Sequence, residues 1–283
     1  MTKQFLTYEQ QIDLLHARGL TTDENTLPQL MRYGYYRIVN GYNAPFLDKS
    51  ATSAARDDRF LPGTSFADLY TLFTFDQQLT SLTLSHLARI ESTLRAVCAH
   101  TFAEAHPKPD AYLDPRNYSA HADERMLDRL ISTMASVARN SDHDMVTHYR
   151  DRYGSVPIWV LVGDLTFGNL ARFLQLMRRR DVVRVCERLT RVTSGEGPLS
   201  IDDARDAVDA FVRARNICAH GDRLYCAEFT PECTSYAELV ELLGHFLTPE
   251  EFDDFKREAA RLVRASADES EEVRRILSIM GFE

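Results

Sequence analysis

Four sequence signals for the start of a helix constrain the fold of this chain most strongly. Each places a Ser or Thr three residues before a Gln, Asp or Glu, the arrangement in which two side chains cap the first turn of a helix reciprocally. Apolar residues spaced three and four apart follow each signal, as in a helix that packs one face on a core. The four pairs are Thr7 with Gln10, Ser65 with Asp68, Ser200 with Asp203, and Thr248 with Glu251.

The same apolar period predicts helices in most of the remaining chain. No alternating run is long enough to predict a strand, so the sequence predicts an all-α protein. The further helices are expected near residues 27–39, 121–139, 142–152, 157–179, 181–191, 235–247 and 269–279.

Two segments rich in turn-forming residues divide the chain. Residues 43–64, with Pro45, Pro62 and Gly63, are predicted to be a linker, and the Ser-Gly-Glu-Gly-Pro segment at 194–198 a second break. We therefore expect residues 1–60 to form a small N-terminal helical module with its linker. Residues 61–283 are expected to form a helical bundle with a C-terminal helical tail.

Charge and cysteine content limit the class of function. The formal net charge of −9 argues against a protein that coats nucleic acid through bulk electrostatics, so any nucleic-acid site must be local. Five cysteines without a C-x-x-C pair or zinc-ligand spacing indicate reduced thiols. The N-terminus lacks an apolar leader, and no apolar run approaches the roughly 18 residues of a membrane span. We expect a soluble, cytoplasmic protein without membrane contacts.

One R-x4-H element carries the chemistry that the sequence suggests. Arg215 and His220 end the helix opened by Ser200, and Gly221 is the residue type that terminates a helix. The dipole at a helix C-terminus favours the imidazolium form of His220, and Arg215 offers a fork of donors to a phosphate. RNA cleavage without a metal needs such a pair, because the 2′-hydroxyl must lose a proton, the phosphorane must be stabilised and the 5′-oxygen must gain a proton.

Helical spacing alone does not prove this reading. Asn216 and His220 share a face, whereas Arg215 lies about 140° away and must use its long stem to reach the same phosphate. The alternative is a helix-end histidine that acts as a cap, with Arg215 paired to a carboxylate such as Asp222. Three copies of the spacing occur, at Arg95–His100, at Arg116–His121 in a turn-like stretch, and at Arg215–His220.

Several blocks in order resemble the Abi-like proteins, the AbiD/AbiF type of bacterial abortive-infection proteins. The block RNICAHGDRLY is similar to the R-N-x-x-A-H-x-x-R-L signature of that family. The resemblance runs from about residue 6 to residue 225. The other similar blocks are LTYEQQIDLLHARGL, YYRIVNGY, FLPGTSFADLYTLFTFDQQL, RIESTLRAVCAH, AYLDPRNY and VPIWVLVGDLTFGNLARF.

This resemblance implies a HEPN-type helical bundle and RNA cleavage in phage defence or as a toxin. It implies that Arg215 and His220 are catalytic, that no metal or cofactor takes part, and that two R-x4-H helices face each other in a homodimer. RNA is the expected partner, as substrate or as bound regulator, and an antitoxin is a further one. The alternatives are a non-catalytic RNA- or protein-binding protein of the same fold and an unrelated helical scaffold.

Residues near the R-x4-H element are assigned supporting roles. Asn216 is interpreted as an orienting residue, and Arg223 either grips phosphate or pairs with Glu228. Glu91 and Arg95 form a routine helix ion pair or, alternatively, order Arg215 and His220 from a neighbouring helix that also carries His100.

Two further groups of side chains have an RNA-binding and a structural interpretation. An arginine stripe contacts RNA phosphates or is a solvated surface, while the opposite helix face docks on the core. Tyrosines at helical spacing stack on bases or pack in the core. The stripe is Arg180, Arg184, Arg188 and Arg191, its core face is Val182, Val185, Cys186 and Leu189, and the tyrosines are Tyr33, Tyr35, Tyr36 and Tyr42.

Overall fold

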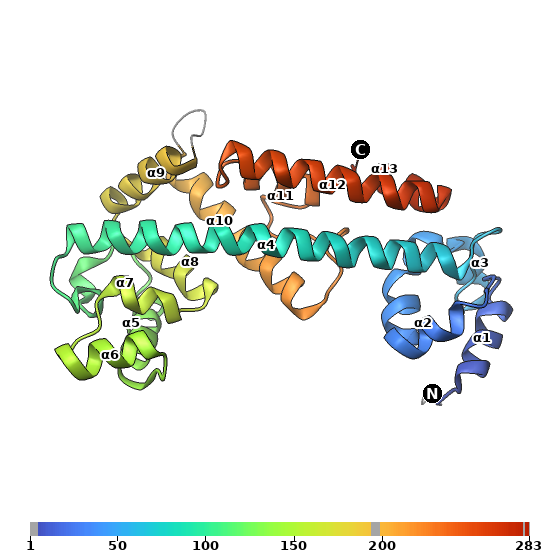
Figure 1. Ribbon diagram of the computed structural model, residues 1–283, viewed down its shortest axis with the longest axis horizontal. Helices are drawn as coiled ribbons and strands as arrows, with labels where there is room; N and C mark the ends of the chain where they lie inside the picture. The colour runs from blue at the N-terminus through green and yellow to red at the C-terminus, as the bar shows by residue number, and fades with distance from the viewer. Residues whose placement is uncertain (1–4, 194–198, 280, 283) are drawn as a thin grey trace. The chain divides into compact units, whose positions relative to one another are not determined.

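The computed structural model describes residues 5–193, 199–279 and 281–282, and helices account for most of them (Figure 1). These residues contain no β-strand, only isolated bridges such as Leu47 with Phe60, so the all-α prediction is confirmed. The α-helices are α1 (Tyr8–Ala17), α2 (Thr26–Tyr33), α3 (Lys49–Ala55), α4 (Phe66–Ala105), α5 (Glu124–Asn140), α6 (Asp144–Tyr153), α7 (Ile158–Leu161), α8 (Phe167–Leu176), α9 (Arg179–Thr193), α10 (Ile201–His220), α11 (Tyr236–Gly244), α12 (Pro249–Glu269) and α13 (Glu271–Ile279).

The four predicted helix starts are confirmed. In each, the amide of the third helical residue donates to the capping hydroxyl, over 3.3 Å at Thr7, 3.2 Å at Ser65, 3.1 Å at Ser200 and 3.3 Å at Thr248. At Thr7, Ser65 and Thr248 the partner side chain also accepts from the backbone amide of the capping residue. These bonds satisfy donors that a helix N-terminus leaves open.

The described chain folds into two compact units. The first unit comprises the described residues up to Leu82, the segment Gly221–Cys226 and the described residues from Lys256 onward. The second unit comprises Thr83–His220 and Ala227–Phe255. Helices α4 and α12 contribute residues to both. The expected domains, residues 1–60 and 61–283, stay a prediction.

Aromatic side chains from distant parts of the sequence form the core of the first unit. Tyr42 stacks on Tyr225 with 6.0 Å between ring centroids and meets Phe73 edge-on at 5.5 Å. Tyr42 is buried, so its aromatic stacking serves the core, as the structural interpretation predicts. Aromatic pairs of this geometry stabilise a core beyond the area they bury.

The segment expected to be a linker, residues 43–64, is folded into the first unit. Phe46 and Phe60 are buried, and the short helix α3 is capped by Asp48, whose carboxylate accepts from the amides of Ser50 and Ala51. Two buried aromatic rings and a capped helix therefore outweigh the turn-forming prolines and glycine around them.

Helix α10 lies in the core of the second unit, where it packs against α8, α9 and α11. Phe211 meets Phe246 edge-on with 5.0 Å between ring centroids. Polar side chains tie α10 to α8, because Arg205 donates to the carbonyl oxygen of Gln175 over 2.9 Å and the Gln175 amide donates to the Asp209 carboxylate. The buried face of α10 includes Ala204, Ala207, Val208, Phe211, Ala214, Ile217 and Cys218.

Two helices that were predicted to be continuous are interrupted. Residues 157–179 form α7, a 3₁₀ turn η5 (Val162–Asp164) and α8, because Leu165 is extended and Thr166 caps a new helix by accepting from the Asn169 amide. Residues 27–39 form α2 and a π-helical turn η1 (Tyr36–Asn40), separated at Gly34, whose φ is 83°. The expected helices at 121–139, 142–152, 181–191, 235–247 and 269–279 are confirmed as α5, α6, α9, α11 and α13.

The predicted break at 194–198 lies outside the described residues. No helix in the described ranges is both long enough and apolar enough to cross a membrane.

Candidate functional site

The C-terminal turn of α10 presents the predicted R-x4-H element at its solvent side. Ala214, Ile217 and Cys218 face the core, which leaves Arg215 and Asn216 half-buried and His220 exposed. The helix ends at His220, and Gly221 follows with a φ of 72°. Glycine adopts this left-handed conformation without the steric cost that a Cβ brings, as the sequence predicts.

Arg215 is positioned within α10 by its neighbour. Its guanidinium donates to the Asn216 side-chain oxygen over 3.0 Å, so Asn216 can orient it. In the part of the chain that the structure describes, Arg215 forms no ion pair with a carboxylate, and the alternative pairing with Asp222 is not seen. A half-buried guanidinium without a carboxylate keeps donors for an anion.

The segment after His220 belongs to the first unit and is held by a buried carboxylate. Asp76 of α4 accepts from the backbone amides of Leu224 over 3.1 Å and Tyr225 over 2.8 Å. It also accepts from the Tyr42 hydroxyl over 2.7 Å. Three sequence blocks of the family resemblance, YYRIVNGY, the FTFDQQL end of the third block, and the HGDRLY end of the R-x4-H block, therefore meet at one side chain.

Burial and hydrogen bonding shift the pKa of the Asp76 carboxyl in opposite directions. Removal from water raises the pKa of the Asp76 carboxyl, while the donors from Tyr42, Tyr225 and Leu224 lower it, and the net shift is upward. Burial together with the neighbouring Asp76 raises the pKa of Tyr42 as well, so the phenol remains a donor.

Two arginines lie beside the same segment. Arg223 donates to the carbonyl oxygen of Gly41 over 2.9 Å, and the described residues include no ion pair between Arg223 and Glu228. Arg37, which the sequence interpretation did not single out, is exposed and donates to Gln77 over 3.0 Å. Its guanidinium lies 3.6 Å from the position that a Cβ on Gly221 would take.

The second R-x4-H copy, on α4, has its arginine engaged. Arg95 pairs with Glu91 one turn earlier and donates to the carbonyl oxygen of Val162, so the routine helix ion pair is confirmed. Within the described ranges, no hydrogen bond or ion pair joins Glu91 or Arg95 to Arg215 or His220. His100, the other end of this copy, is exposed.

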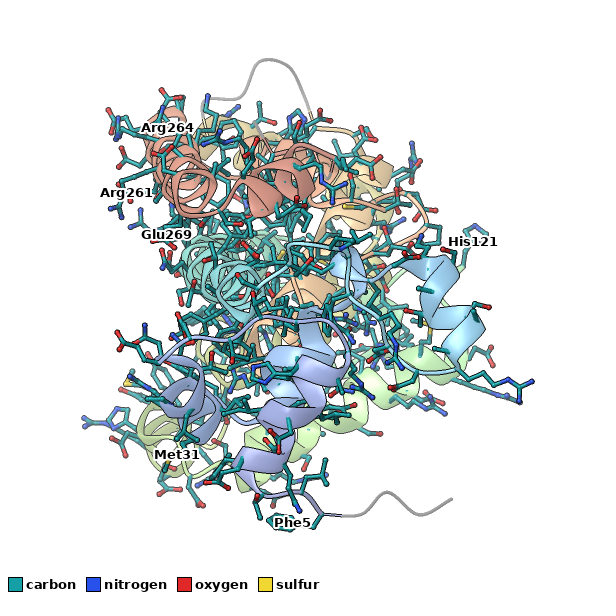
Figure 2. All side chains as sticks on the ribbon, turned by 90° about the vertical axis from the view of Figure 1, so that its right-hand side faces the viewer. Phe5, Met31, His121, Arg261, Arg264 and Glu269 are labelled. Atoms are coloured by element: carbon teal, nitrogen blue, oxygen red, sulfur yellow. The ribbon has the colours of Figure 1, made fainter. Side chains whose placement is uncertain are left out.

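The third copy lies on an exposed turn, as predicted. Arg116 of η4 (Pro115–Asn117) pairs with Asp114 at 2.7 Å. His121 is exposed, and Figure 2 shows it at the periphery. Its arginine is thus held by a carboxylate, in contrast to Arg215.

The arginine stripe of α9 is only partly available to a phosphate. Arg180, Arg184 and Arg191 are exposed, while Arg188 is half-buried and donates to Glu104 and to the Thr101 hydroxyl, each over 2.8 Å. Arg180 lies 3.6 Å from Asp181. The predicted core face is confirmed, since Val182, Val185, Cys186 and Leu189 are buried.

The tyrosines of the N-terminal part are mostly engaged in packing. Tyr33 lies edge-on to Phe73 at 5.1 Å, and Tyr35 accepts from Arg18 over 3.1 Å. Tyr36, by contrast, is 80% exposed, which leaves it open to a stacking partner.

Sequence reasoning missed Asp76 and Arg37. The signal for Asp76 was an acidic residue within the apolar stripe of α4, between Phe73 and Leu79, because a buried carboxylate at such a position needs donors. Arg37 gave no such signal. The described side chains include no group of three His, Cys, Asp or Glu that could hold a metal ion.

These features define an all-helical protein that presents an arginine and a histidine at the exposed end of a core helix. The sequence profile of the family described as Abi-like protein matches residues 28–226, which is more than half of the chain. The chain therefore belongs to the Abi-like protein family. Comparisons with curated proteins and with solved structures found no significant match.

Proposed function

We propose that the chain is a metal-independent endoribonuclease of the abortive-infection type, built on a HEPN-type helical bundle. The observation that carries this proposal is the state of Arg215, half-buried near the end of α10 with no carboxylate partner in the described residues. Exposed His220 ends the same helix. Membership in the Abi-like family supports a role in abortive infection, a form of phage defence.

The two side chains divide the chemistry. His220 takes the proton of a 2′-hydroxyl as its oxygen attacks the adjacent phosphorus, and Arg215 stabilises the negative charge of the phosphorane. The bond from phosphorus to the 5′-oxygen then breaks, and that oxygen takes up a proton. Asn216 keeps the Arg215 guanidinium oriented through the 3.0 Å hydrogen bond.

A homodimer supplies the second proton-transfer group. One imidazole cannot take a proton from the 2′-oxygen and deliver another to the 5′-oxygen in the same step. His220 of a second copy supplies the acid if two α10 termini face each other. RNA is then the partner of the dimer, and an antitoxin that covers the same surface is a further proposed partner.

Substitution of each residue tests the site. His220→Ala should lower the cleavage rate by a factor of roughly 10² to 10⁴, because it removes proton transfer. Arg215→Ala should remove about 3 kcal/mol of transition-state stabilisation. Both proteins should keep the circular dichroism and melting temperature of the wild type, since neither side chain is in the core. EDTA should leave wild-type cleavage unchanged.

Arg116→Ala and His121→Ala are matched controls, because they alter the same spacing on an exposed turn and should leave cleavage unchanged. Cleavage at the wild-type rate by a folded His220→Ala protein would exclude the mechanism. Cleavage that EDTA abolishes would show that a metal takes part. RNA binding without cleavage by the wild type would favour the non-catalytic alternative.

A further inference from the structure

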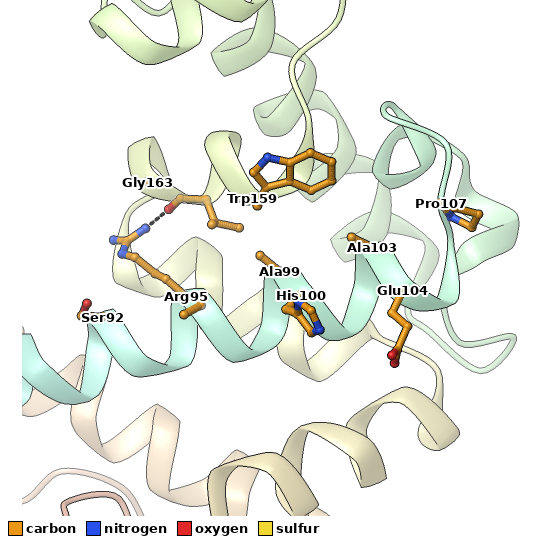
Figure 3. Close-up of a pocket in the computed structure, with 11 residues that line it drawn as sticks. Ser92, Arg95, Ala99, His100, Ala103, Glu104, Pro107, Trp159 and Gly163 are labelled. Atoms are coloured by element: carbon orange, nitrogen blue, oxygen red, sulfur yellow. Dashed lines mark hydrogen bonds between the residues drawn. The ribbon is translucent and has the colours of Figure 1, made fainter. Parts of the chain in front are cut away.

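A pocket in the second unit lies between α4 and the segment formed by α7 and η5 (Figure 3). Its volume is about 810 Å³, within the range of roughly 300–1,000 Å³ that is usual for ligand pockets. No residue of the proposed catalytic pair lines it. The pocket is therefore distinct from the proposed catalytic pair.

The pocket offers flat apolar surfaces on opposite sides. Ala96, Ala99 and Ala103 line it from α4, where spacings of three and four residues place them on one helix face. Trp159 of α7 lies across from Ala99 in Figure 3, and this indole is 55% exposed although it is large and apolar. An exposed indole opposite a strip of methyl groups suits a planar aromatic ring.

The polar groups of the pocket are few and lie around these surfaces. Arg95 is a fixed part of the wall, because its guanidinium is held by Glu91 and by the carbonyl oxygen of Val162. Ser92, His100 and Glu104 are exposed and line the pocket, so they offer donors and acceptors to the edge of a bound ring. A nucleobase has this combination of apolar faces and polar edges.

Positive charge lies next to the pocket at its Glu104 end. Arg188 of α9 contacts Glu104 at 2.8 Å. The hydrogen bond from Arg188 is the main cause that lowers the pKa of the Glu104 carboxyl. Arg184, exposed one turn earlier on α9, and His100 are close enough to lower it further. The described residues show no ion pair for Arg184, so its guanidinium is open to a phosphate that follows the base along a strand.

We propose that this pocket binds one base of single-stranded RNA, stacked on Trp159, while Arg184 contacts the adjoining phosphate. The choice of RNA rests on the proposed function. Base stacking on aromatic side chains tolerates many sequences, so the pocket would hold the strand rather than read it.

Trp159 makes the inference directly measurable, because it is the one tryptophan of the chain. The full-length His220→Ala protein is titrated with a short single-stranded oligoadenylate, so that cleavage does not disturb the signal. Tryptophan emission should fall as oligoadenylate is added and should reach a plateau once the pocket is filled. An abasic oligonucleotide of the same length keeps the phosphates but has no bases, and it should leave the emission unchanged.

Ala96→Phe fills the pocket from an exposed position and should remove the quenching and weaken binding roughly tenfold. Ala88→Phe is the matched control, since Ala88 is exposed on the same helix but does not line the pocket. Trp159→Ala, measured by the polarisation of a labelled oligoadenylate, gives a second test that should show the same weakening.

Equal quenching by the abasic strand, or full affinity in both Ala96→Phe and Trp159→Ala, would overturn the inference. A failure of this inference can be distinguished from a failure of the proposed function. Cleavage by the wild type without quenching would leave the nuclease and remove the base pocket. Quenching with no cleavage by the wild type would leave an RNA-binding pocket on a non-catalytic protein.

Discussion

The buried carboxylate of Asp76 accepts from three donors, which are the Tyr42 hydroxyl and the amides of Leu224 and Tyr225. Tyr42→Phe should lower the free energy of unfolding by about 1–3 kcal/mol, and Asp76→Ala by more, because the latter leaves three donors without their acceptor. Thermal and denaturant unfolding measure both. Asp13→Ala, which removes an exposed carboxylate from α1, should change stability by less than about 0.5 kcal/mol. A melting temperature unchanged by Asp76→Ala would contradict this role for the carboxylate.

The buried side chain of His106 should make the free energy of unfolding depend on pH. Its Nε2 lies 3.4 Å from buried Asp181, and burial lowers the pKa of His106 below 6.5 although Asp181 opposes the shift; Arg178 and Arg180 reinforce it. The unfolded chain therefore binds this proton more readily than the folded chain. The contribution to stability is complete above about pH 6.5 and declines as the pH falls from there through the folded pKa.

The His106 prediction is tested by comparing unfolding free energies across this window. His106→Gln should flatten the pH dependence, whereas His121→Gln, at an exposed histidine, should leave its slope unchanged. The same slope in His106→Gln and the wild type would show that other groups cause it.

Among the helices, we propose α9 as an RNA-binding surface, because Arg180, Arg184 and Arg191 are exposed on it. Arg184→Glu with Arg191→Glu should weaken binding of single-stranded RNA and reduce the magnitude of the log–log salt slope by about 0.7 for each phosphate that α9 no longer neutralises. Melting temperature should hardly change, because both side chains are exposed. Arg261→Glu with Arg264→Glu on α12, where both side chains are exposed, changes the net charge by the same amount and is the control (Figure 2). An unchanged slope would mean that α9 presents ordinary solvated surface.

The elements also show what the sequence could and could not predict. Helix starts were predictable because a cap such as Thr7 with Gln10 is made by residues three apart. The interruption at Leu165 was not, since the apolar period runs on through it. The R-x4-H element was predictable because its spacing is local and its sequence block resembles that of the family. The residues that surround it were not predictable, because Asp76 lies 148 residues before Leu224, whose amide it binds. The pocket at Trp159 likewise depends on the packing of separate helices.

At the scale of the whole molecule, the proposed homodimer can be tested with two inactive proteins. If one site uses α10 from both copies, mixing His220→Ala with Arg215→Ala should restore a small part of the cleavage, because a mixed dimer joins one intact arginine to one intact histidine that acts as the base, while water replaces the missing acid. Size-exclusion chromatography with light scattering should show the dimer. No recovery in mixed dimers that have demonstrably formed would contradict a site in which an arginine of one copy and a histidine of the other can act together.

The first unit is assembled from separated stretches of chain, and its segment Gly221–Cys226 lies in the sequence between the two stretches that form the second unit. During synthesis, Asp76 and Tyr42, which bond to each other, emerge long before the Leu224 and Tyr225 amides that also donate to Asp76. The residues from Lys256 onward emerge later still. Completion of this unit must therefore wait until the ribosome has translated the residues that follow Lys256, so a nascent chain that stalls earlier lacks a finished first unit.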